Sequence, residues 1–385
     1  MAVNNEERDH LVRSLRQFAE REVKPRVARY DAEERIPPDL LTQMAGLDLF
    51  GGTVPLEWGG TALDHLTYAT LIEEISKYDH VLGVLMSMPS ALVGAGILAF
   101  GTEEQKKRYL VPLAKGQTFG GAGVTEPQSG SDVAGTRTRY RQVSDGYVIN
   151  GRKAWISNLD IASFFVMFAV REGEEGRTAM SAFVVPSDAP GLIRNPFRNK
   201  LGFRPICTGE LAFDDVVVPP DALIGQEGEG FQVAMIAVER GRLSVAARAV
   251  GLAQACLDDS IAWAKERTTF GRRIASYQQV GAKLADMAMQ TRAARLLVRE
   301  CAEAIDAGRS DARLAASIAK CYASDVAQRV ATDAVQIHGA HGVAEEVRVS
   351  RCYRDAKVFQ IVEGTNEVQR NIIASTLTGL KGMPG

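Results

Sequence analysis

The sequence predicts an α+β multidomain protein in which a helical region, a strand-rich region and a second helical region follow one another. Apolar residues recur at helical spacing in the first and last parts of the chain, and short β-branched and aromatic runs fill the middle. The 385 residues also exceed what one hydrophobic core usually organises. We therefore expect an N-terminal helical domain over 1–118, a central antiparallel β-barrel or sandwich over 119–228, and a C-terminal four-helix bundle over 229–385.

The N-terminal region carries amphipathic helical patterns separated by turn residues. A helical stretch is expected from Tyr68 to Tyr78, and the apolar, small-residue run over 81–100 favours a pair of buried helices. Pro37-Pro38 and Gly51-Gly52 interrupt the pattern. The first helix presents one apolar face, formed by His10, Leu11, Leu15 and Phe18.

The central and C-terminal regions have different periods. Asp145-Gly146 predicts a hairpin turn, and 164–170, 182–185 and 211–213 are short strand-like runs. In the last region the apolar residues return to helical spacing with few breakers, which favours long bundled helices. The positions are Leu284, Met287, Thr291, Ala294, Val298, Cys301 and Ile305, then Leu314, Ile318, Cys321 and Tyr322.

Composition narrows the classes of function. The net charge is −2 with Lys and Arg spread along the chain, so no nucleic-acid-binding stripe is expected. No run approaches about 20 unbroken apolar residues, and the polar N-terminus shows no signal or transit peptide, so we expect a cytoplasmic protein without a membrane span. Five scattered cysteines favour buried free thiols, and His338 and His341, although three apart, lack further ligands at metal-site spacing.

One stretch near the C-terminus places a carboxylate at a chain break. An apolar run over 358–362 leads to Glu363, and Gly364 permits a sharp turn because it has no Cβ. A helix restarts at once, with Asn366 and Gln369 spaced as a capping box. A glutamate in a loop is more often a solvated charge, but one held between apolar helices is placed to act as a base, and burial would raise its pKa.

Four other motifs occur upstream in a fixed order: 121–132 (GAGVTEPQSGSD), 154–158 (AWISN), 266–271 (ERTTFG) and 336–342 (QIHGAHG). Together with 361–369 (IVEGTNEVQ) they resemble the acyl-CoA dehydrogenase family, and the resemblance runs from about residue 10 to about residue 378. It implies an FAD-dependent enzyme that converts an acyl-CoA thioester to the 2-enoyl-CoA. It also implies a homotetramer or homodimer that passes electrons to an electron-transferring flavoprotein.

The resemblance assigns a role to each motif. Glu363 is the base that takes the α-proton while hydride leaves Cβ for flavin N5. Some relatives place their base at position 241, where this chain has Gly241. The residues assigned to FAD are Val124, Thr125, Trp155, Ser157, Arg267, Phe270, Gln336, Gly339, Thr365 and Glu367, and those assigned to substrate are Ser131, Arg242 and Gly364.

Arg242 is expected to neutralise a CoA phosphate or to support substrate binding. Arg267, Phe270, Gln336 and Gly339 are expected to serve the FAD of a neighbouring subunit. Gln128 and Ala340 stand where the family usually has glycine. Taken alone, Trp155 could be a core residue of the barrel and Arg267 a helix-end charge.

Several functions remain open on the sequence. The thioester carrier could be an acyl-carrier protein, the electron acceptor could be oxygen, or the protein could be an idle flavoprotein that binds nucleic acid. The net charge and the intact Glu363-Gly-Thr disfavour the last of these. The acyl pocket is expected to include parts of 78–95. Glutaryl-type members carry an arginine near the position of Gly83, and its absence disfavours a dicarboxylic substrate.

Overall fold

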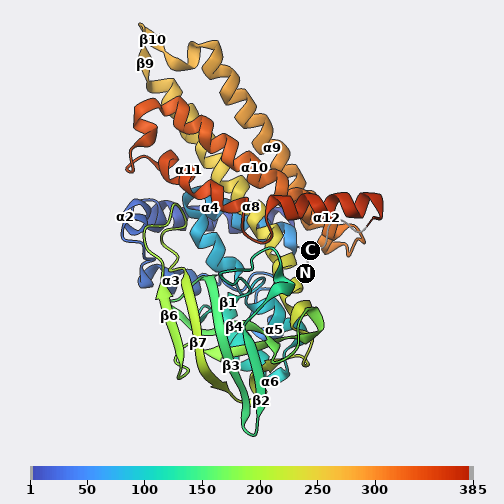
Figure 1. Ribbon diagram of the computed structural model, residues 1–385. Coiled ribbons are helices and arrows are strands. Elements are labelled where there is room, and N and C mark those ends of the chain that lie inside the picture. The colour runs from blue at the N-terminus through green and yellow to red at the C-terminus, as the bar shows by residue number, and fades with distance from the viewer. Residues whose placement is uncertain (1–2, 381–385) are drawn as a thin grey trace.

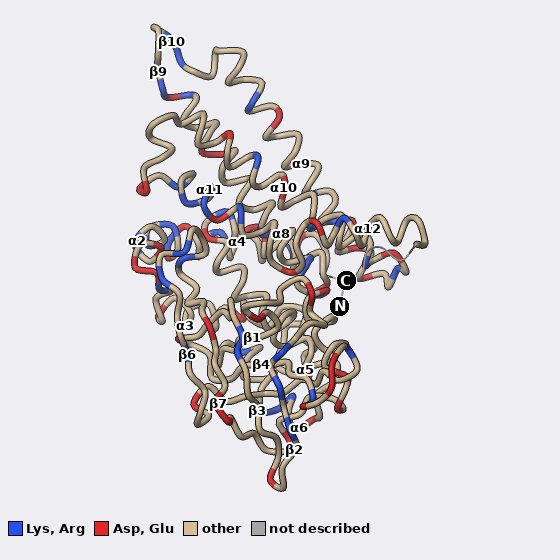
Figure 2. The backbone as a smooth tube through the Cα atoms, viewed as in Figure 1, with Lys and Arg blue, Asp and Glu red and all other residues tan. Residues whose placement is uncertain are grey.

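The predicted α–β–α order is confirmed by the structure, a computed structural model that describes residues 3–380. In Figure 1 the sheet fills the lower half of the molecule and the long C-terminal helices fill the upper half. The long N-terminal helix α4 (His65–Ser87) lies where the two halves meet. Lys, Arg, Asp and Glu are interspersed along the whole chain (Figure 2). Within residues 3–380 no helix is long and apolar enough to cross a membrane.

The N-terminal region is helical as predicted. Asn4 begins α1 with a capping box, and Leu15 and Phe18 of its expected apolar face are buried. Helix α4 is interrupted at Asp79, whose backbone is extended (φ −154°, ψ 111°) and whose carboxylate accepts a hydrogen bond from the Val81 N–H. Helix α1 spans Asn5–Phe18. The other α-helices of this region are α2 (Val27–Ala32), α3 (Pro38–Gly46), α5 (Gly94–Phe100), α6 (Glu103–Gln105) and α7 (Val111–Ala114).

The central region is one mixed sheet in the order β6-β7-β3-β2-β4-β5-β8, with β1 paired to β4. The predicted hairpin is present, because Val143 pairs with Gly146. The expectation of a purely antiparallel sheet is wrong in two places: β1 and β2 both pair with β4 in parallel, because longer connections carry the chain across the sheet. The strands are β1 (Phe119–Gly123), β2 (Arg139–Val143), β3 (Gly146–Ile156), β4 (Ala162–Arg171), β5 (Met180–Pro186), β6 (Leu192–Pro196), β7 (Gly209–Val218) and β8 (Leu223–Ile224).

The C-terminal region is a helical bundle built on α8 (Gly230–Glu266), α9 (Gln278–Asp306) and α10 (Ala312–His338). The short strands β9 (Thr268–Thr269) and β10 (Arg272–Arg273) form a hairpin at the end of the bundle farthest from the sheet (Figure 1). Two shorter helices, α11 (Arg348–Phe359) and α12 (Asn366–Thr378), complete it. All five cysteines are free, and four of them are buried.

Candidate active site

Glu363 lies in the turn between α11 and α12, as the sequence predicts. Gly364 adopts φ 86°, and Glu363 itself adopts φ 56°, a left-handed conformation that is uncommon for a residue with a Cβ. The predicted capping box is wrong. Thr365 caps α12 by accepting a hydrogen bond from the Val368 N–H at 3.3 Å, which frees Asn366 and Gln369 for other contacts.

Two buried side chains hold this turn in place. The Gln369 side-chain amide donates to the carbonyl oxygens of Glu363 (3.2 Å) and Gly364 (3.1 Å). Lys320, fully buried on α10, donates from Nζ to the Gly364 carbonyl oxygen (2.8 Å) and to Asn366 Oδ1 (2.9 Å). Lys320 comes from the long helix α10 and Gln369 is itself fully buried on α12, so the backbone around Glu363 is held by buried side chains on both sides of the turn.

The Glu363 carboxylate points into the protein. The residue as a whole is only half-buried, but its Oε2 is inaccessible to solvent and has no hydrogen-bond partner. A Cβ on Gly241 of α8 would lie 2.6 Å from Glu363 Cδ, so the glycine makes the room that the carboxylate occupies. Burial raises the pKa of Glu363, Arg248, Arg242 and Lys320 oppose the rise, and the resulting pKa is about 7.

Two buried arginines of α8 flank this carboxylate. Arg242 donates from Nη1 to Ser317 Oγ at 3.4 Å, and its Nε has no partner. Because Arg242 is buried, its position favours the second of the two roles expected for it, support of substrate binding, over contact with a phosphate at the surface. Sequence reasoning missed Arg248. Its signal is a single charge inside the otherwise apolar and small run over 245–251.

Trp155 is a large aromatic residue that the fold leaves exposed. It adopts φ 62° at the end of β3, and 63% of the residue is accessible to solvent. Its ring meets the edge of Phe197 with centroids 5.0 Å apart. Trp155 is therefore not a core residue of the sheet, and its indole is available to a planar ligand.

The other residues expected at the flavin ring gather beside Trp155. The Ala154 N–H donates to the Thr125 carbonyl oxygen at 2.9 Å, which places the segment of Val124 and Thr125 against the end of β3. A Cβ on Gly121 would lie 2.8 Å from the Ser157 carbonyl oxygen, so β1 and the Ser157 backbone are in close contact. We call Val124, Thr125, Trp155 and Ser157 the Trp155 face.

A buried ion pair stiffens the loop that leaves β1. Lys153 Nζ lies 2.7 Å from Glu126 Oε1, and both side chains are almost fully buried. Burial alone would raise the pKa of Glu126, but Lys153 and hydrogen bonds from Thr138 and Arg137 outweigh it and lower the pKa to about 2. Gln128, which departs from the family pattern, donates to Glu126 Oε2 at 2.5 Å. No spacing or motif in the sequence predicts the pairing of Glu126 with Lys153.

Four of the predicted cofactor residues lie elsewhere. Arg267, Phe270, Gln336 and Gly339 are all exposed. Arg267 and Phe270 adjoin the β9–β10 hairpin, and Gln336 and Gly339 lie at the end of α10, where His338 stacks on Trp263 of α8. This hairpin is at the end of the bundle farthest from the sheet (Figure 1). Phe270 is 93% accessible to solvent. The fold of one chain therefore does not bring these four residues to the Trp155 face.

The remaining predicted residues occupy simpler positions. Ser131 is exposed in the loop between β1 and β2. Thr365 is the helix cap described above, and Glu367 is exposed in the first turn of α12. His338 and His341 pack against Trp263, with ring centroids 5.2 and 5.0 Å from it.

Helix α4 connects Glu363 with the Trp155 face. A Cβ on Gly83 would lie 3.0 Å from Arg248 Cγ, so this part of α4 packs on the arginine next to Glu363. One residue beyond the end of the helix, Met88 Sδ accepts a hydrogen bond from Asn158 Nδ2 at 2.8 Å, just after the Trp155 face. The end of α4 thus touches both parts of the site.

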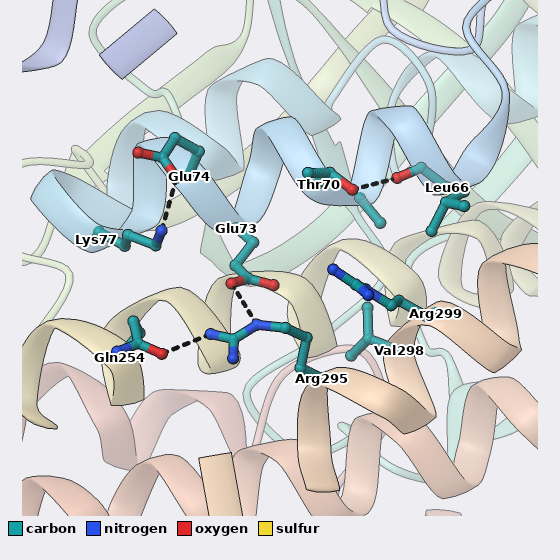
Figure 3. A pocket seen from close by; sticks show the side chains of 10 residues that line it. Leu66, Thr70, Glu73, Glu74, Lys77, Gln254, Arg295, Val298 and Arg299 are labelled. Carbon is teal, nitrogen blue, oxygen red and sulfur yellow. Dashed lines mark hydrogen bonds and ion pairs between the residues drawn. The ribbon is translucent and has the colours of Figure 1, made fainter. Parts of the chain in front are cut away.

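A separate hollow of about 380 Å³ lies between α4, α8 and α9 (Figure 3). Its polar side chains satisfy one another: Arg295 pairs with Glu73 (2.8 Å) and donates to Gln254 (2.7 Å). Lys77 pairs with Glu74 at 2.6 Å in the same wall. The groups around Glu363 differ, because Glu363, Arg242 and Arg248 each keep a buried polar atom without a partner.

Comparison with known proteins identifies three family models in order along the chain. They are described as the N-terminal, middle and C-terminal domains of acyl-CoA dehydrogenase, and they match residues 5–117, 121–216 and 228–378. The short-chain-specific acyl-CoA dehydrogenase of Clostridium acetobutylicum is 39% identical over 378 residues, covering 98% of this chain and 100% of the relative. The caffeyl-CoA reductase-Etf complex subunit CarC of Acetobacterium woodii is 36% identical over 373 residues, covering 96% and 98%.

Solved structures of acyl-CoA dehydrogenases also superpose on this chain. The butyryl-CoA dehydrogenase of Megasphaera elsdenii superposes with a TM-score of 0.93 at 37% identity, covering 98% of this chain and 99% of the other. A glutaryl-CoA dehydrogenase from Mycobacterium smegmatis in complex with FADH2 superposes with a TM-score of 0.92 at 26% identity, covering 99% and 97%.

Proposed function

The chain belongs to the acyl-CoA dehydrogenase family, an FAD-dependent class of oxidoreductases, and from this premise we propose that Glu363 is the base that removes the α-proton of an acyl-CoA thioester. The observation that carries the proposal is the Glu363 carboxylate itself. It is held on a rigid turn, its Oε2 is buried without a partner, and its pKa is about 7. A base with a pKa near the working pH combines ionisation with proton affinity.

The residues of the Trp155 face fit an isoalloxazine ring. The exposed indole offers an aromatic surface, and the adjoining backbone of β1 is glycine-rich and closely packed. Val124, Thr125, Trp155 and Ser157 would hold the ring. Bound FAD supplies the oxidant, which accepts the hydride that leaves Cβ of the acyl chain.

Glu363 performs the proton transfer in this scheme. The Cα–H bond breaks and the proton passes to a Glu363 carboxylate oxygen, while the electron pair forms the Cα=Cβ bond as hydride departs from Cβ. The Glu363 N–H has no hydrogen-bond partner within residues 3–380, so it is available to donate to the thioester carbonyl oxygen as negative charge develops there. Gly364, at φ 86°, allows the sharp turn that directly follows Glu363, so the N–H and the carboxylate proposed for these two roles belong to one residue whose backbone is held in place.

Other residues bind rather than react. Arg242, buried beside Glu363, adds positive charge near the thioester, and Ser131 lies in an exposed loop where it can meet the pantetheine or phosphate part of CoA. The low accessibility of the carboxylate also excludes water, which strengthens each of these electrostatic interactions.

We also propose that neighbouring subunits complete the cofactor site. Arg267, Phe270, Gln336 and Gly339 would contact the FAD held mainly by another copy of the chain, in a homotetramer or homodimer. The support is their exposure at the far end of the bundle. An electron-transferring flavoprotein is the proposed acceptor of the electrons, since the similar protein CarC of Acetobacterium woodii is a subunit of a caffeyl-CoA reductase-Etf complex. Location in the cytoplasm stays a prediction.

The test of the base is Glu363→Gln, which keeps the size of the side chain but cannot accept a proton. Binding of butyryl-CoA should survive, while bleaching of the flavin under anaerobic conditions should slow by at least about 10³-fold. Glu346→Gln, at an exposed position between α10 and α11, is the matched control and should react like the wild type. Near wild-type bleaching in Glu363→Gln would remove Glu363 from this role.

The test of shared cofactor binding is sedimentation. Phe270→Ala should lower FAD content and weaken assembly together, because a cofactor that binds only the assembled state stabilises it. A stable monomer saturated with FAD would contradict shared binding without affecting the role of Glu363.

A further inference from the structure

Arg248 is a buried cation without a partner of opposite charge. Only 3% of the residue is accessible to solvent, and its Nη1 is buried with no hydrogen bond. Its Nε donates weakly, at 3.3 Å, to the Ser244 carbonyl oxygen of its own helix. Among residues 3–380 no carboxylate lies within 4.0 Å of it. Burying a charge without a partner is costly. The buried guanidinium of Arg248 is therefore suited to bind an anionic group that comes from a ligand and not from the chain itself.

The surroundings of Arg248 are built to hold it. The guanidinium lies over the rings of Phe203 and Phe359, 6.0 and 5.7 Å from their centroids. Gly83 of α4 leaves the space that the side chain fills, because a Cβ there would lie 3.0 Å from Arg248 Cγ. The buried Tyr68 of α4 is close enough to interact with it electrostatically. These contacts orient the side chain but do not neutralise its charge.

Arg248 is close to the reacting end of the site. Gly241, which touches the Glu363 carboxylate, lies one turn before Ser244, and Arg248 Nε reaches back to Ser244. The guanidinium is therefore roughly 5 Å along the α8 axis from the level of that carboxylate. Arg248 and Glu363 influence each other electrostatically, yet they form no direct ion pair. A few carbon–carbon bonds and one charge-assisted hydrogen bond of about 2.8 Å would cover this span.

We propose that Arg248 receives the carboxylate at the far end of a short acyl chain, so that the preferred substrate is the CoA monothioester of a four- to six-carbon dicarboxylic acid. The inference rests on the proposed function, because it takes Glu363 as the point where the α-carbon lies. The substrate carboxylate would supply the missing counter-charge and accept from Nη1. Arg248 is in this role a specificity-determining residue and not the base.

This placement revises the expectation drawn from Gly83. From the sequence, the absence of an arginine at position 83 predicts that a dicarboxylic substrate is disfavoured. The structure places the Cγ and Cδ methylenes of Arg248 against that same glycine, so the arginine side chain reaches this region from α8 instead of α4. A buried cation therefore lies close to Glu363 although α4 does not provide it.

Pairs of substrates that differ in one carboxylate provide the test. Succinyl-CoA with butyryl-CoA, glutaryl-CoA with pentanoyl-CoA, and adipyl-CoA with hexanoyl-CoA would be compared by anaerobic flavin bleaching in the FAD-loaded protein. The wild type should favour at least one dicarboxylic partner by about 10- to 100-fold in kcat/KM, the range expected for a buried hydrogen bond between charged groups. This comparison needs no variant.

Substitutions assign the preference to the residue. Arg248→Met should abolish the preference within each pair, and Arg248→Lys should retain part of it. Because Arg248 also lowers the pKa of Glu363, its loss changes the absolute rates at a given pH, so the measured quantity is the ratio of kcat/KM between the two members of a pair. Arg240→Gln removes a charge from an exposed position of the same helix and should change nothing. Flavin content and thermal unfolding confirm that each variant is folded.

The other outcomes are equally informative. A wild type that prefers the monocarboxylic thioesters at every length overturns the inference. So does an Arg248→Met variant that slows both members of each pair equally, because Arg248 would then act only on the ionisation of Glu363. If the wild type bleaches with none of the six thioesters but does bleach with longer or branched acyl-CoAs, only the inference about Arg248 is overturned. Absence of bleaching with every acyl-CoA would contradict the proposed function instead.

Discussion

Gly241 and Glu363 are in contact although 122 positions separate them in the sequence: a Cβ on Gly241 would lie 2.6 Å from Glu363 Cδ and within 2.9 Å of both carboxylate oxygens. The missing side chain on α8 is therefore part of the shape of the site. A side chain at position 241 could not occupy this space together with the Glu363 carboxylate.

Gly241→Ala should displace the carboxylate while leaving the bundle folded, because the methyl group meets the mobile end of a side chain and not the backbone. We expect flavin bleaching to slow by about 10²-fold, the usual effect of a misplacement of about 1 Å. Thermal unfolding and FAD content should stay near the wild type. Gly281→Ala on the neighbouring α9, where a Cβ meets nothing within 4 Å, is the control.

The wild-type rate of flavin bleaching should rise with pH through one ionisation near pH 7. Burial raises the pKa of Glu363 from its usual value of 4.5 to about 7, and only the ionised carboxylate accepts a proton. Rates at pH 6 should therefore be well below those at pH 8. A profile that is flat above pH 5 would mean that the carboxylate is solvated in the working enzyme.

Lys320→Met should shift that ionisation to higher pH. Lys320 lowers the pKa of Glu363 electrostatically, so its removal allows burial to raise the pKa further. The substitution also deletes the hydrogen bonds to the Gly364 carbonyl oxygen and Asn366 Oδ1, which should cost about 1–3 kcal/mol of stability. Stopped-flow bleaching between pH 6 and 9, with urea unfolding beside it, measures both effects, and Lys357→Met, exposed on α11, is the control.

Trp155→Ala should reduce FAD retention more than it reduces the stability of the FAD-free protein. Most of the indole is exposed, so its removal leaves little cavity, whereas a stacked ring would lose its aromatic surface. The measurements are the ratio of flavin to protein after gel filtration and the position of the flavin absorption band. Equal FAD content with a large drop in unfolding temperature would return Trp155 to a structural role.

The sequence predicted the order of the elements and the turn at Glu363 because these depend on local properties. Helical spacing is visible in a sequence, and Gly364 adopts the positive φ that only glycine accepts easily. The sequence predicts Asn366 as the N-cap of α12, whereas in the structure the N-cap is the preceding residue, Thr365. Asn366 and Gln369 have the spacing of a box, but their side chains are used by Lys320 and the turn carbonyls instead.

Contacts between distant elements could not be predicted in this way. On α10, Leu314, Ile318 and Tyr322 of the expected apolar face are half-buried and Cys321 is buried, while small residues such as Ala316, Ala319 and Ala323 make up much of the face that packs against the bundle. The pairing of Glu126 with Lys153 and the placement of Arg248 beside Gly83 depend on how the strands and helices assemble. For Arg248, the local sign in the sequence is a single arginine within the alanine-rich run over 245–251.

The distance between the Trp155 face and the exposed residues beside β9 and β10 would let two damaged copies of the chain repair each other. A copy with Glu363→Gln keeps an intact bundle end, and a copy with Phe270→Ala keeps an intact base. In a mixed assembly, the intact bundle end of the Glu363→Gln copy would meet the intact Glu363 and Trp155 face of the Phe270→Ala copy at one site. The two inactive variants should therefore regain part of the activity when they are produced together. Because the repair needs both halves at one interface, it should disappear on dilution below the concentration at which the subunits associate.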